Sequence, residues 1–114
     1  MAFKMSVNDP TGTTFEAHFQ LKKFMAERTL TQKSGVIAYN MYRGKANYLA
    51  GKGHVVQMFV KIADADQVDD AGVTVAVKFS DVWGKNLTQI DTKIRTKKVQ
   101  SPVGVLDLTQ AVDD

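Results

Sequence analysis

A short stretch over residues 39–54, YNMYRGKANYLAGKGH, combines aromatic and basic side chains. Single-stranded nucleic acids bind where aromatic rings stack on bases and cations contact phosphates. Side chains suited to these two tasks are Tyr39, Tyr42, Tyr48, Arg43, Lys45 and Lys52. The run KIRTKK would extend the cationic track with Lys93, Arg95, Lys97 and Lys98. One hypothesis is therefore a nucleic-acid-binding surface on a small barrel of the OB type.

The same stretch also suits an ordinary hairpin. In that interpretation Gly44, Gly51 and Gly53 make turns, the tyrosines pack on one sheet face, and the lysines protect a strand edge from aggregation. The net charge is only +3, because twelve acidic residues offset fifteen basic ones. A dedicated nucleic-acid-binding protein usually carries a larger basic excess, so the charge balance favours the hairpin.

Catalytic chemistry has few candidate residues in this chain. It contains no cysteine and two histidines, and it lacks the GxSxG, HExxH, Walker A and GxGxxG patterns. His18 falls on the outward face of a predicted strand, where a solvated or interface histidine is expected. We therefore expect no enzyme activity, no cofactor and no small-molecule substrate.

An acidic cluster follows the middle of the chain, at Asp64, Asp66, Asp69 and Asp70. Calcium loops bring several carboxylates together, but an EF-hand starting at Asp64 would place Val68 at the fifth position and Asp69 at the glycine position. A solvated hairpin loop is the expected structure, and no metal site is predicted. Such a loop would also suit a basic partner surface, which leaves open a third hypothesis, a small inhibitor.

Trp83, the one tryptophan, lies in the turn-like segment SDVWGKN. An exposed tryptophan would be an anchor for a partner protein. A buried one would close the end of the hydrophobic core.

The elements that position these residues are predicted to be strands, because apolar and polar residues alternate repeatedly. The clearest segments are FEAHFQL (15–21), VVQMFVKI (55–62) and VTVAVKF (73–79), the last with Val73, Val75, Val77 and Phe79 facing inward. We expect the second and third to form an antiparallel hairpin across the loop ADADQVDDAG. The fold class predicted is mainly β: one small antiparallel sandwich or barrel spanning residues 1–114 as a single domain.

Two segments are ambiguous. KKFMAERTLTQ (22–32) is the candidate for the one short helix we expect at most, although its end is rich in threonine. LTQIDTKIRTKKV (87–99) has apolar residues at both helical and strand spacing. Its β-branched residues favour a strand.

The 114 residues are 44% hydrophobic, which suits one compact domain. No apolar run approaches the roughly 20 residues that span a bilayer, and the first ten residues lack the apolar region of a signal peptide. We therefore expect no membrane association, with the chain cytoplasmic at synthesis.

Surface complementarity is the remaining basis for function. The leading hypothesis is a structural protein that binds neighbouring copies or a larger protein lattice, by analogy with viral decoration, capsid-stabilising or tail proteins, and that is thereby incorporated into a virion. Apolar residues 2–7 would add as a strand to a neighbour's edge, and segregated charges would orient the contact. The predicted interface residues are Phe3, Met5, Trp83, Asp64, Asp66, Asp69 and Asp70.

Overall fold

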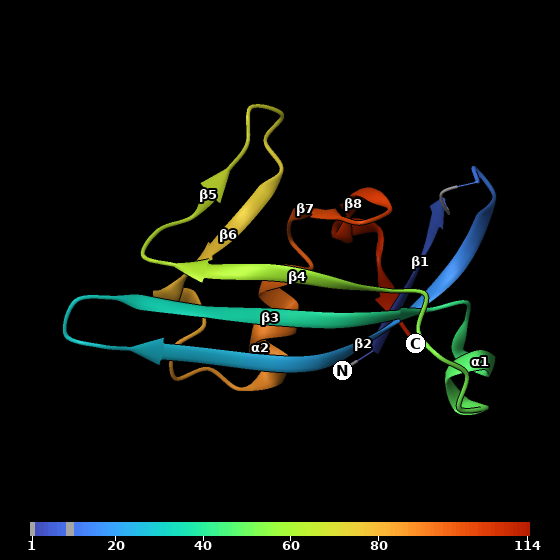
Figure 1. Cartoon of the computed structure of the whole chain (residues 1–114), viewed down its shortest axis with the longest axis horizontal. Coiled ribbons are helices and arrows are strands. Elements are labelled where there is room, and N and C mark those ends of the chain that lie inside the picture. Colours follow the sequence, from blue (N-terminus) through green and yellow to red (C-terminus); the bar gives the residue numbers. More distant parts are fainter. Residues whose placement is uncertain (1, 9–10) are drawn as a thin grey trace.

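The computed structural model of the chain describes residues 2–8 and 11–114. One sheet has the strand order β8-β7-β6-β4-β3-β2-β1-β9, and β5 pairs with β6 off this path (Figure 1). The strands are β1 (Ala2–Asn8), β2 (Thr14–Arg28), β3 (Lys33–Tyr42), β4 (Val56–Ala63), β5 (Gln67–Val68), β6 (Thr74–Lys78), β7 (Lys98–Ser101), β8 (Gly104–Asp107) and β9 (Val112–Asp113). The helices are α1 (Lys45–Leu49) and α2 (Leu87–Ile94), with single 3-10 turns η1 (Phe79–Asp81) and η2 (Leu108–Gln110).

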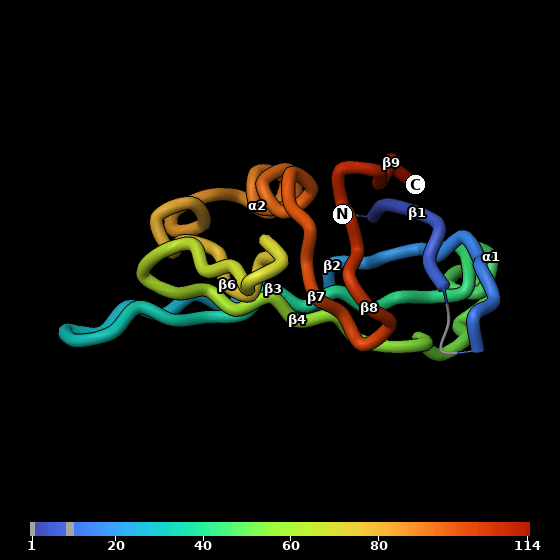
Figure 2. Tube along the Cα trace, turned by 90° about the horizontal axis from the view of Figure 1, so that it is seen from above, coloured from blue at the N-terminus to red at the C-terminus, as the bar shows by residue number. Residues whose placement is uncertain are grey.

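The sheet curls into a half-barrel, with α2 packed on its concave side (Figure 2). Ile90 and Ile94 of α2 are fully buried against the inward side chains of the central strands, such as Ile37 and Met58. The mainly β prediction is therefore confirmed. The sheet is an open half-barrel because its end strands β8 and β9 do not pair with each other.

Alternation correctly predicted the inward faces of two strands. Ala17 and Phe19 of β2 are fully buried, and Met58, Val60 and Ile62 of β4 are buried while Phe59 and Lys61 are exposed. In an extended chain, successive side chains point to opposite faces of the sheet. Local pattern was sufficient at these positions because one face of each strand meets the core.

The predicted antiparallel hairpin between β4 and β6 is wrong, since these strands pair in parallel. The segment between them contains β5, which forms its own antiparallel pair with β6 around a turn held by Asp69. Because the chain reverses direction once more at β5, β6 enters the sheet in the same direction as β4. The parallel pairing of β6 with β7 follows the crossover through α2.

The predicted face of β6 is also wrong at one position. Val73 and Val77 are buried, but Val75 is 40% exposed while Thr74 and Ala76 are buried. The pairing of β6 with β5 changes register between Gln67↔Ala76 and Val68↔Thr74, so Val75 is an extra residue on β6. Such a bulge interrupts the simple alternation of faces.

We expect Val77→Asp to destabilise the fold by about 3–5 kcal/mol, because it leaves an unpaired charge in the core. Val75→Asp should change the free energy of unfolding by about 1 kcal/mol or less. Urea unfolding of the two variants measures both values. Equal losses would contradict the assignment of these side chains to opposite environments.

The predicted helix around residues 22–32 is wrong: residues 22–28 continue β2, and residues 29–32 form the turn into β3. β2 and β3 pair antiparallel from His18↔Tyr42 to Arg28↔Lys33, with a bulge at Lys22. Helix propensities differ by less than about 1 kcal/mol per residue, and pairing along ten β3 residues outweighs them. Within residues 2–8 and 11–114 there are two short α-helices, and neither lies at this position.

The β2–β3 hairpin depends on a close approach at Gly35. A Cβ atom built on this glycine would lie 2.1 Å from the Met25 carbonyl oxygen and 2.9 Å from the Ala26 Cα. Only glycine fits here, since any side chain would force the two strands apart.

Gly35→Ala should therefore destabilise the protein by about 1–3 kcal/mol through overpacking. Gly53→Ala is the matched control, because a Cβ there meets nothing within 4 Å and its backbone is not left-handed. Thermal unfolding followed by circular dichroism compares the two. A Gly35→Ala melting curve superimposable on the wild type would refute the close packing.

Residues 87–94 form helix α2 where we predicted a strand. Asn86 accepts a hydrogen bond from the Gln89 amide at 2.8 Å, while the Gln89 side chain accepts one from the Asn86 amide at 3.0 Å. This capping box satisfies the first turn of the helix. Thr92 and Thr96 donate to backbone carbonyls, which reconciles β-branched residues with the helix and its end.

No helix in the described residues is long and apolar enough to cross a membrane.

Candidate protein interface

The β2–β3 hairpin over residues 22–35, called the arm below, continues β2 beyond its pairing with β1. The end of the arm, past the pairing of Gly35 with Ile62 of β4, projects beyond the body of the protein (Figures 1 and 2). Leu30 at its tip is fully exposed, and Met25 on its side is 47% exposed. Apolar side chains at the end of a projecting element have few intramolecular contacts to gain. The arm is therefore the clearest candidate for contact with another molecule.

The outer edge of β2 is open along this arm. β1 pairs with β2 only as far as Gln20, and beyond it no strand among the described residues lies on that side. Strand edges with unpaired N–H and C=O groups readily accept another strand.

The alternation of hydrogen-bonded pairs along the arm shows which backbone N–H and C=O groups of β2 are not bonded to β3. The Thr29 amide donates to the Gln32 carbonyl at 2.8 Å, which closes a two-residue turn. Hydrogen-bonded and non-hydrogen-bonded pairs alternate along an antiparallel ladder. Counting back from Thr29, β2 directs its bonds to β3 at Glu27, Met25 and Lys23. The groups on the open side therefore belong to Phe24, Ala26 and Arg28.

Charged residues line the same edge. Lys22, Lys23, Glu27 and Arg28 are all exposed, and none of them has an ion pair in the described part of the chain. The arm thus presents three cations and one anion to solvent or to a partner.

A second opening lies between β1 and β8, the two sides of the half-barrel. A groove of about 590 Å³ is lined there by Met5, Val7, Val103, Val105 and Asp107, among others. β9 pairs with β1 only at Phe3 and Lys4, so the rest of this β1 edge borders the groove. Met5, a predicted interface residue, is half-buried in this groove.

Phe3 has a structural role that excludes partner contact. It is fully buried, stacks on Phe19 with ring centroids 4.7 Å apart, and lies under the Arg95 guanidinium. The prediction that Phe3 contacts a partner is therefore wrong. β1 is paired with β2 along its length and with β9 at Phe3 and Lys4, so it is part of its own sheet and, among the described residues, only its edge from Met5 to Asn8 stays open.

Trp83 combines the two roles considered for it. Its ring stacks on the buried Phe79 at 4.8 Å between centroids, yet 48% of the residue remains exposed. The Lys33 ammonium, beside the turn at the tip of the arm, lies 5.9 Å from the centroid of the same Phe79 ring. Trp83 therefore covers one end of the core and still offers an aromatic surface beside the arm.

All four residues of the acidic cluster are exposed, and two of them also hold the local backbone in place. Asp69 accepts amides of its own turn, and Asp66 accepts the Lys78 amide and lies 3.8 Å from the Lys97 ammonium. Asp64 and Asp70 are exposed, with Asp64 bordering a surface hollow at the arm tip. The four carboxylates do not converge, since no group of three metal-binding side chains occurs in the described residues.

The predicted stacking tyrosines are only partly accessible. Tyr39 is fully buried and donates a hydrogen bond to Asp91 at 2.8 Å, so its predicted role in stacking on bases is wrong. Tyr42 is 8% exposed and packs edge-on against Tyr48 of α1 at 5.0 Å. Tyr48 retains 37% exposure. The tyrosines do not form an aromatic track.

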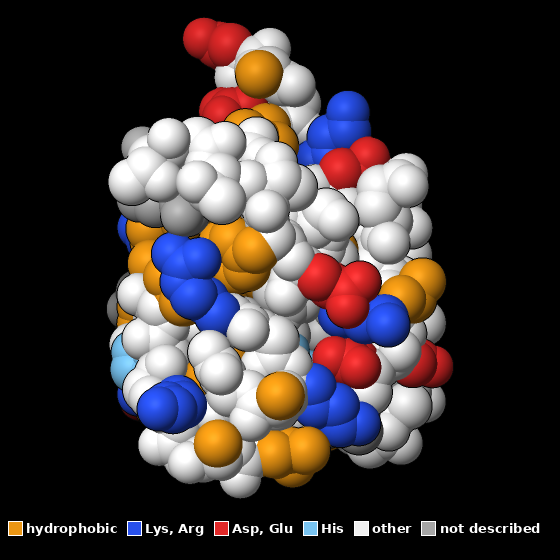
Figure 3. Space-filling view, turned by 90° about the vertical axis from the view of Figure 1, so that its right-hand side faces the viewer, with side chains coloured by type: hydrophobic (Ala, Val, Ile, Leu, Met, Phe, Trp, Pro, Cys, Tyr) orange, Lys and Arg blue, Asp and Glu red, His pale blue; other side chains and the backbone are white. Residues whose placement is uncertain are grey.

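The predicted cations are dispersed as well. Arg43 lies over the Phe15 ring, and on the end of the molecule that carries α1, basic side chains alternate with acidic, apolar and neutral ones (Figure 3). Lys45 and Lys52 are exposed beside Tyr48. In the KIRTKK run, Lys93 pairs with Asp81, Arg95 with Asp91 and Asp113, and Lys97 with Asp66, while Lys98 is exposed.

His18, predicted to be a solvated or interface histidine on the outward face of its strand, is fully buried within its own chain. Its Nδ1 lies 2.7 Å from an Asp114 carboxylate oxygen, its Nε2 lies 2.8 Å from the Gln20 amide nitrogen, and the Tyr48 ring covers it at 5.1 Å. Both ring nitrogens are engaged by polar groups. The histidine thus anchors the C-terminal residue to the outer face of the sheet.

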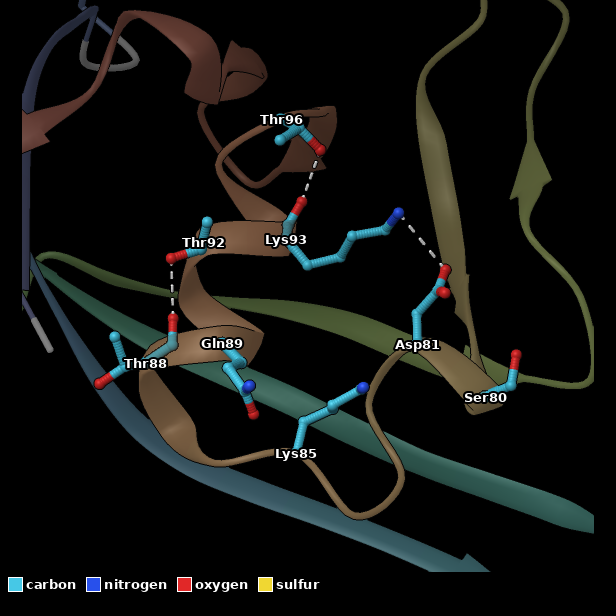
Figure 4. A pocket seen from close by; sticks show the side chains of 8 residues that line it. All are labelled: Ser80, Asp81, Lys85, Thr88, Gln89, Thr92, Lys93 and Thr96. Carbon is cyan, nitrogen blue, oxygen red and sulfur yellow. Dashed lines mark hydrogen bonds and ion pairs between the residues drawn. The ribbon is translucent and has the colours of Figure 1, made fainter.

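A hollow of about 470 Å³ lies between η1 and α2 (Figure 4). Lys93 reaches across it to Asp81, while Thr92 and Thr96 donate to helix carbonyls. These polar groups serve the helix and its attachment to η1. The hollow therefore offers fewer unused groups for a partner than the arm does.

Comparison with protein-family models, curated proteins and solved structures gave no match to this chain.

Sequence reasoning missed the open edge of β2. It also missed the exposed side chains along this edge and at the turn, Lys23, Met25, Glu27 and Leu30. Because a helix was predicted over residues 22–32, no exposed strand edge was expected there. A signal was present: Thr29 and Thr31 flank Leu30 between two apolar runs, which is compatible with a turn between strands.

The Tyr39 hydroxyl connects β3 to α2. Burial, and then the charge and hydrogen bond of Asp91, raise the pKa of this hydroxyl above its ordinary value. As the pH rises above about 10, tyrosine ionises in the unfolded chain while Tyr39 keeps its proton in the folded state, so the free energy of unfolding falls.

Tyr39→Phe should therefore lower stability at neutral pH by about 1–3 kcal/mol, because the buried Asp91 loses a donor. It should also remove the Tyr39 contribution to alkaline destabilisation. Urea unfolding at neutral and alkaline pH measures both effects, with Tyr48→Phe as the exposed control. An unchanged stability at neutral pH would show that the Tyr39–Asp91 bond contributes nothing.

Proposed function

We propose that this chain is a non-enzymatic structural protein that binds neighbouring copies or a larger protein lattice. The observation that carries the proposal is the projecting arm with an open strand edge and exposed Leu30 and Met25. A viral decoration, capsid-stabilising or tail protein remains the analogy for such a role. The location in a virion is part of the same proposal.

Three surface features support an assembly role. The arm provides backbone groups for strand addition and apolar side chains for burial. Trp83 provides an aromatic surface stacked on the Phe79 ring, which Lys33 of the arm also contacts. The groove between β1 and β8 provides a second opening lined by Met5 and Val105.

The N-terminal segment, predicted from the sequence to add as a strand to a neighbour's edge, does not support the proposal, because β1 is paired with β2 and Phe3 is buried in the core. Removing residues 1–7 would delete nearly all of β1, including the buried Phe3 and Val7. The deletion would disrupt the core, so it is unsuitable as a test of association. The arm replaces that segment as the element to change.

Nucleic-acid binding stays a prediction for the exposed residues Tyr48, Lys45 and Lys52. The burial of Tyr39 and Tyr42 and the ion pairs of the KIRTKK run give it less support than the arm gives to assembly.

The proposal is tested by sedimentation velocity of the full chain from low micromolar to near-millimolar concentration. We expect concentration-dependent association. Leu30→Asp should raise the apparent dissociation constant at least about tenfold if the arm tip is buried in the contact. The matched control is Leu49→Asp on α1, which alters a leucine that is 71% exposed.

A wild-type chain that sediments as a monomer throughout this range would contradict self-association. Equal effects of Leu30→Asp and Leu49→Asp would contradict the role of the arm. Circular dichroism of both variants checks that each remains folded.

A further inference from the structure

The open edge of β2 has a sequence that is complementary to itself. An antiparallel pair of identical strands places each residue opposite another residue of the same segment. If the two sheets continue as one, a two-fold axis lies perpendicular to them, and only residues of the same face can be opposite each other. Lys23, Met25 and Glu27 share one face, while Phe24 and Ala26 share the other.

We propose that two copies of the chain associate by antiparallel pairing of their β2 edges over residues 23–27, with Met25 of one copy opposite Met25 of the other. This inference rests on the proposed function and names a second copy of the chain as the partner. The contact is closed by its two-fold symmetry, so it forms a dimer and does not propagate along the edge.

Charge complementarity selects this register. With Met25 on the axis, Lys23 of each copy lies opposite Glu27 of the other, which makes two equivalent ion pairs. Centring the contact on Phe24 would place Lys23 opposite Met25, and centring it on Ala26 would place Glu27 opposite Met25. Neither alternative pairs the charges. Lys23 and Glu27 form no ion pair within the described part of their own chain, so both are available.

The alternation of backbone hydrogen bonds along β2 supports the same register. Phe24 and Ala26 carry the open N–H and C=O groups, and they lie opposite each other when Met25 is on the axis. Each such pair exchanges two hydrogen bonds. The Met25 pair is then a non-hydrogen-bonded pair, in which opposite Cα atoms are about 4.5 Å apart and side chains are close. The Met25 side chain is flexible and about half-exposed, so it can pack against Met25 of the second copy.

The ends of the segment limit the pairing. Lys22 is the extra residue of the bulge and would approach Arg28 of the second copy. Like charges and the bend of a bulge both disfavour further pairing. Lys22 and Lys23 therefore disfavour the addition of unrelated strands to this edge, and they restrict pairing of the two β2 edges to one register.

The absence of cysteine permits a direct test of the register. Met25→Cys places two thiols opposite each other at a separation compatible with a disulfide. We expect mild oxidation to convert most of this variant into a covalent dimer that is lost on reduction. Val68→Cys, at a position that is 62% exposed, is the control and should remain largely uncrosslinked.

Charge reversal provides an independent test. Lys23→Glu and Glu27→Lys should each raise the dimer dissociation constant at least about tenfold, because each places two like-charged pairs across the axis. Mixing the two single variants should restore association as a heterodimer, since every opposing pair is again of opposite charge. Lys45→Glu, which changes the net charge equally on α1, should leave the dimer unchanged.

The outcomes separate this inference from the proposed function. Association of the wild type that is impaired by Leu30→Asp, with no crosslinking at Met25→Cys and no rescue on mixing, would overturn the β2 contact and leave the assembly role standing. A monomeric wild type would overturn the β2 dimer together with the proposed binding between copies. Equal crosslinking of Met25→Cys and Val68→Cys would reveal random collision and would likewise overturn the register.

Discussion

The antiparallel pairing of β2 with β3 is the interaction on which the rest of the structure depends. The first part of β2 also pairs with β1, and β3 also pairs with β4, so these two strands form the centre of the sheet. The far part of the same hairpin continues past its neighbours and becomes the arm. Gly35 keeps the two strands close at the point where the arm leaves the body, because its missing side chain makes room for the Met25 carbonyl. The same antiparallel pair of strands, β2 and β3, therefore runs from the core to the end of the arm.

The second requirement is the attachment of α2 to the concave side of the sheet. Apolar burial of Ile90 and Ile94 supplies most of the contact, and a polar network directs it. Asp91 accepts the Tyr39 hydroxyl and lies 3.6 Å from Arg95, and Arg95 also binds Asp113 and the Ala111 carbonyl. The C-terminal segment is thereby held beside β1. This arrangement explains why cations that looked available for nucleic acid in the sequence are occupied in the fold.

Unpaired backbone groups distinguish the arm from the hollow beside α2 and from the acidic turn. Side chains in the hollow beside α2 and in the acidic turn satisfy groups of their own chain, whereas Phe24, Ala26 and Arg28 direct backbone groups away from it. A strand edge gains hydrogen bonds and apolar burial from the same neighbour, and the alternating charges of Lys23 and Glu27 restrict which neighbour fits. Assembly through this edge requires little rearrangement, because the arm already has strand geometry.

The sequence by itself determined the mainly β class and the inward faces of β2 and β4, because alternation such as Ala17–Phe19 and Met58–Val60–Ile62 reflects a strand with one buried face. It also determined the absence of thiol chemistry. Only the tertiary structure decided that residues 22–28 extend a strand and residues 87–94 form a helix, since local propensities of less than about 1 kcal/mol per residue are outweighed by pairing and capping. It likewise decided that Tyr39 is buried, that β6 is parallel to β4, and that the β2 edge is open. These features depend on contacts between residues far apart in the chain, such as Tyr39 with Asp91 and His18 with Asp114, which no local pattern records.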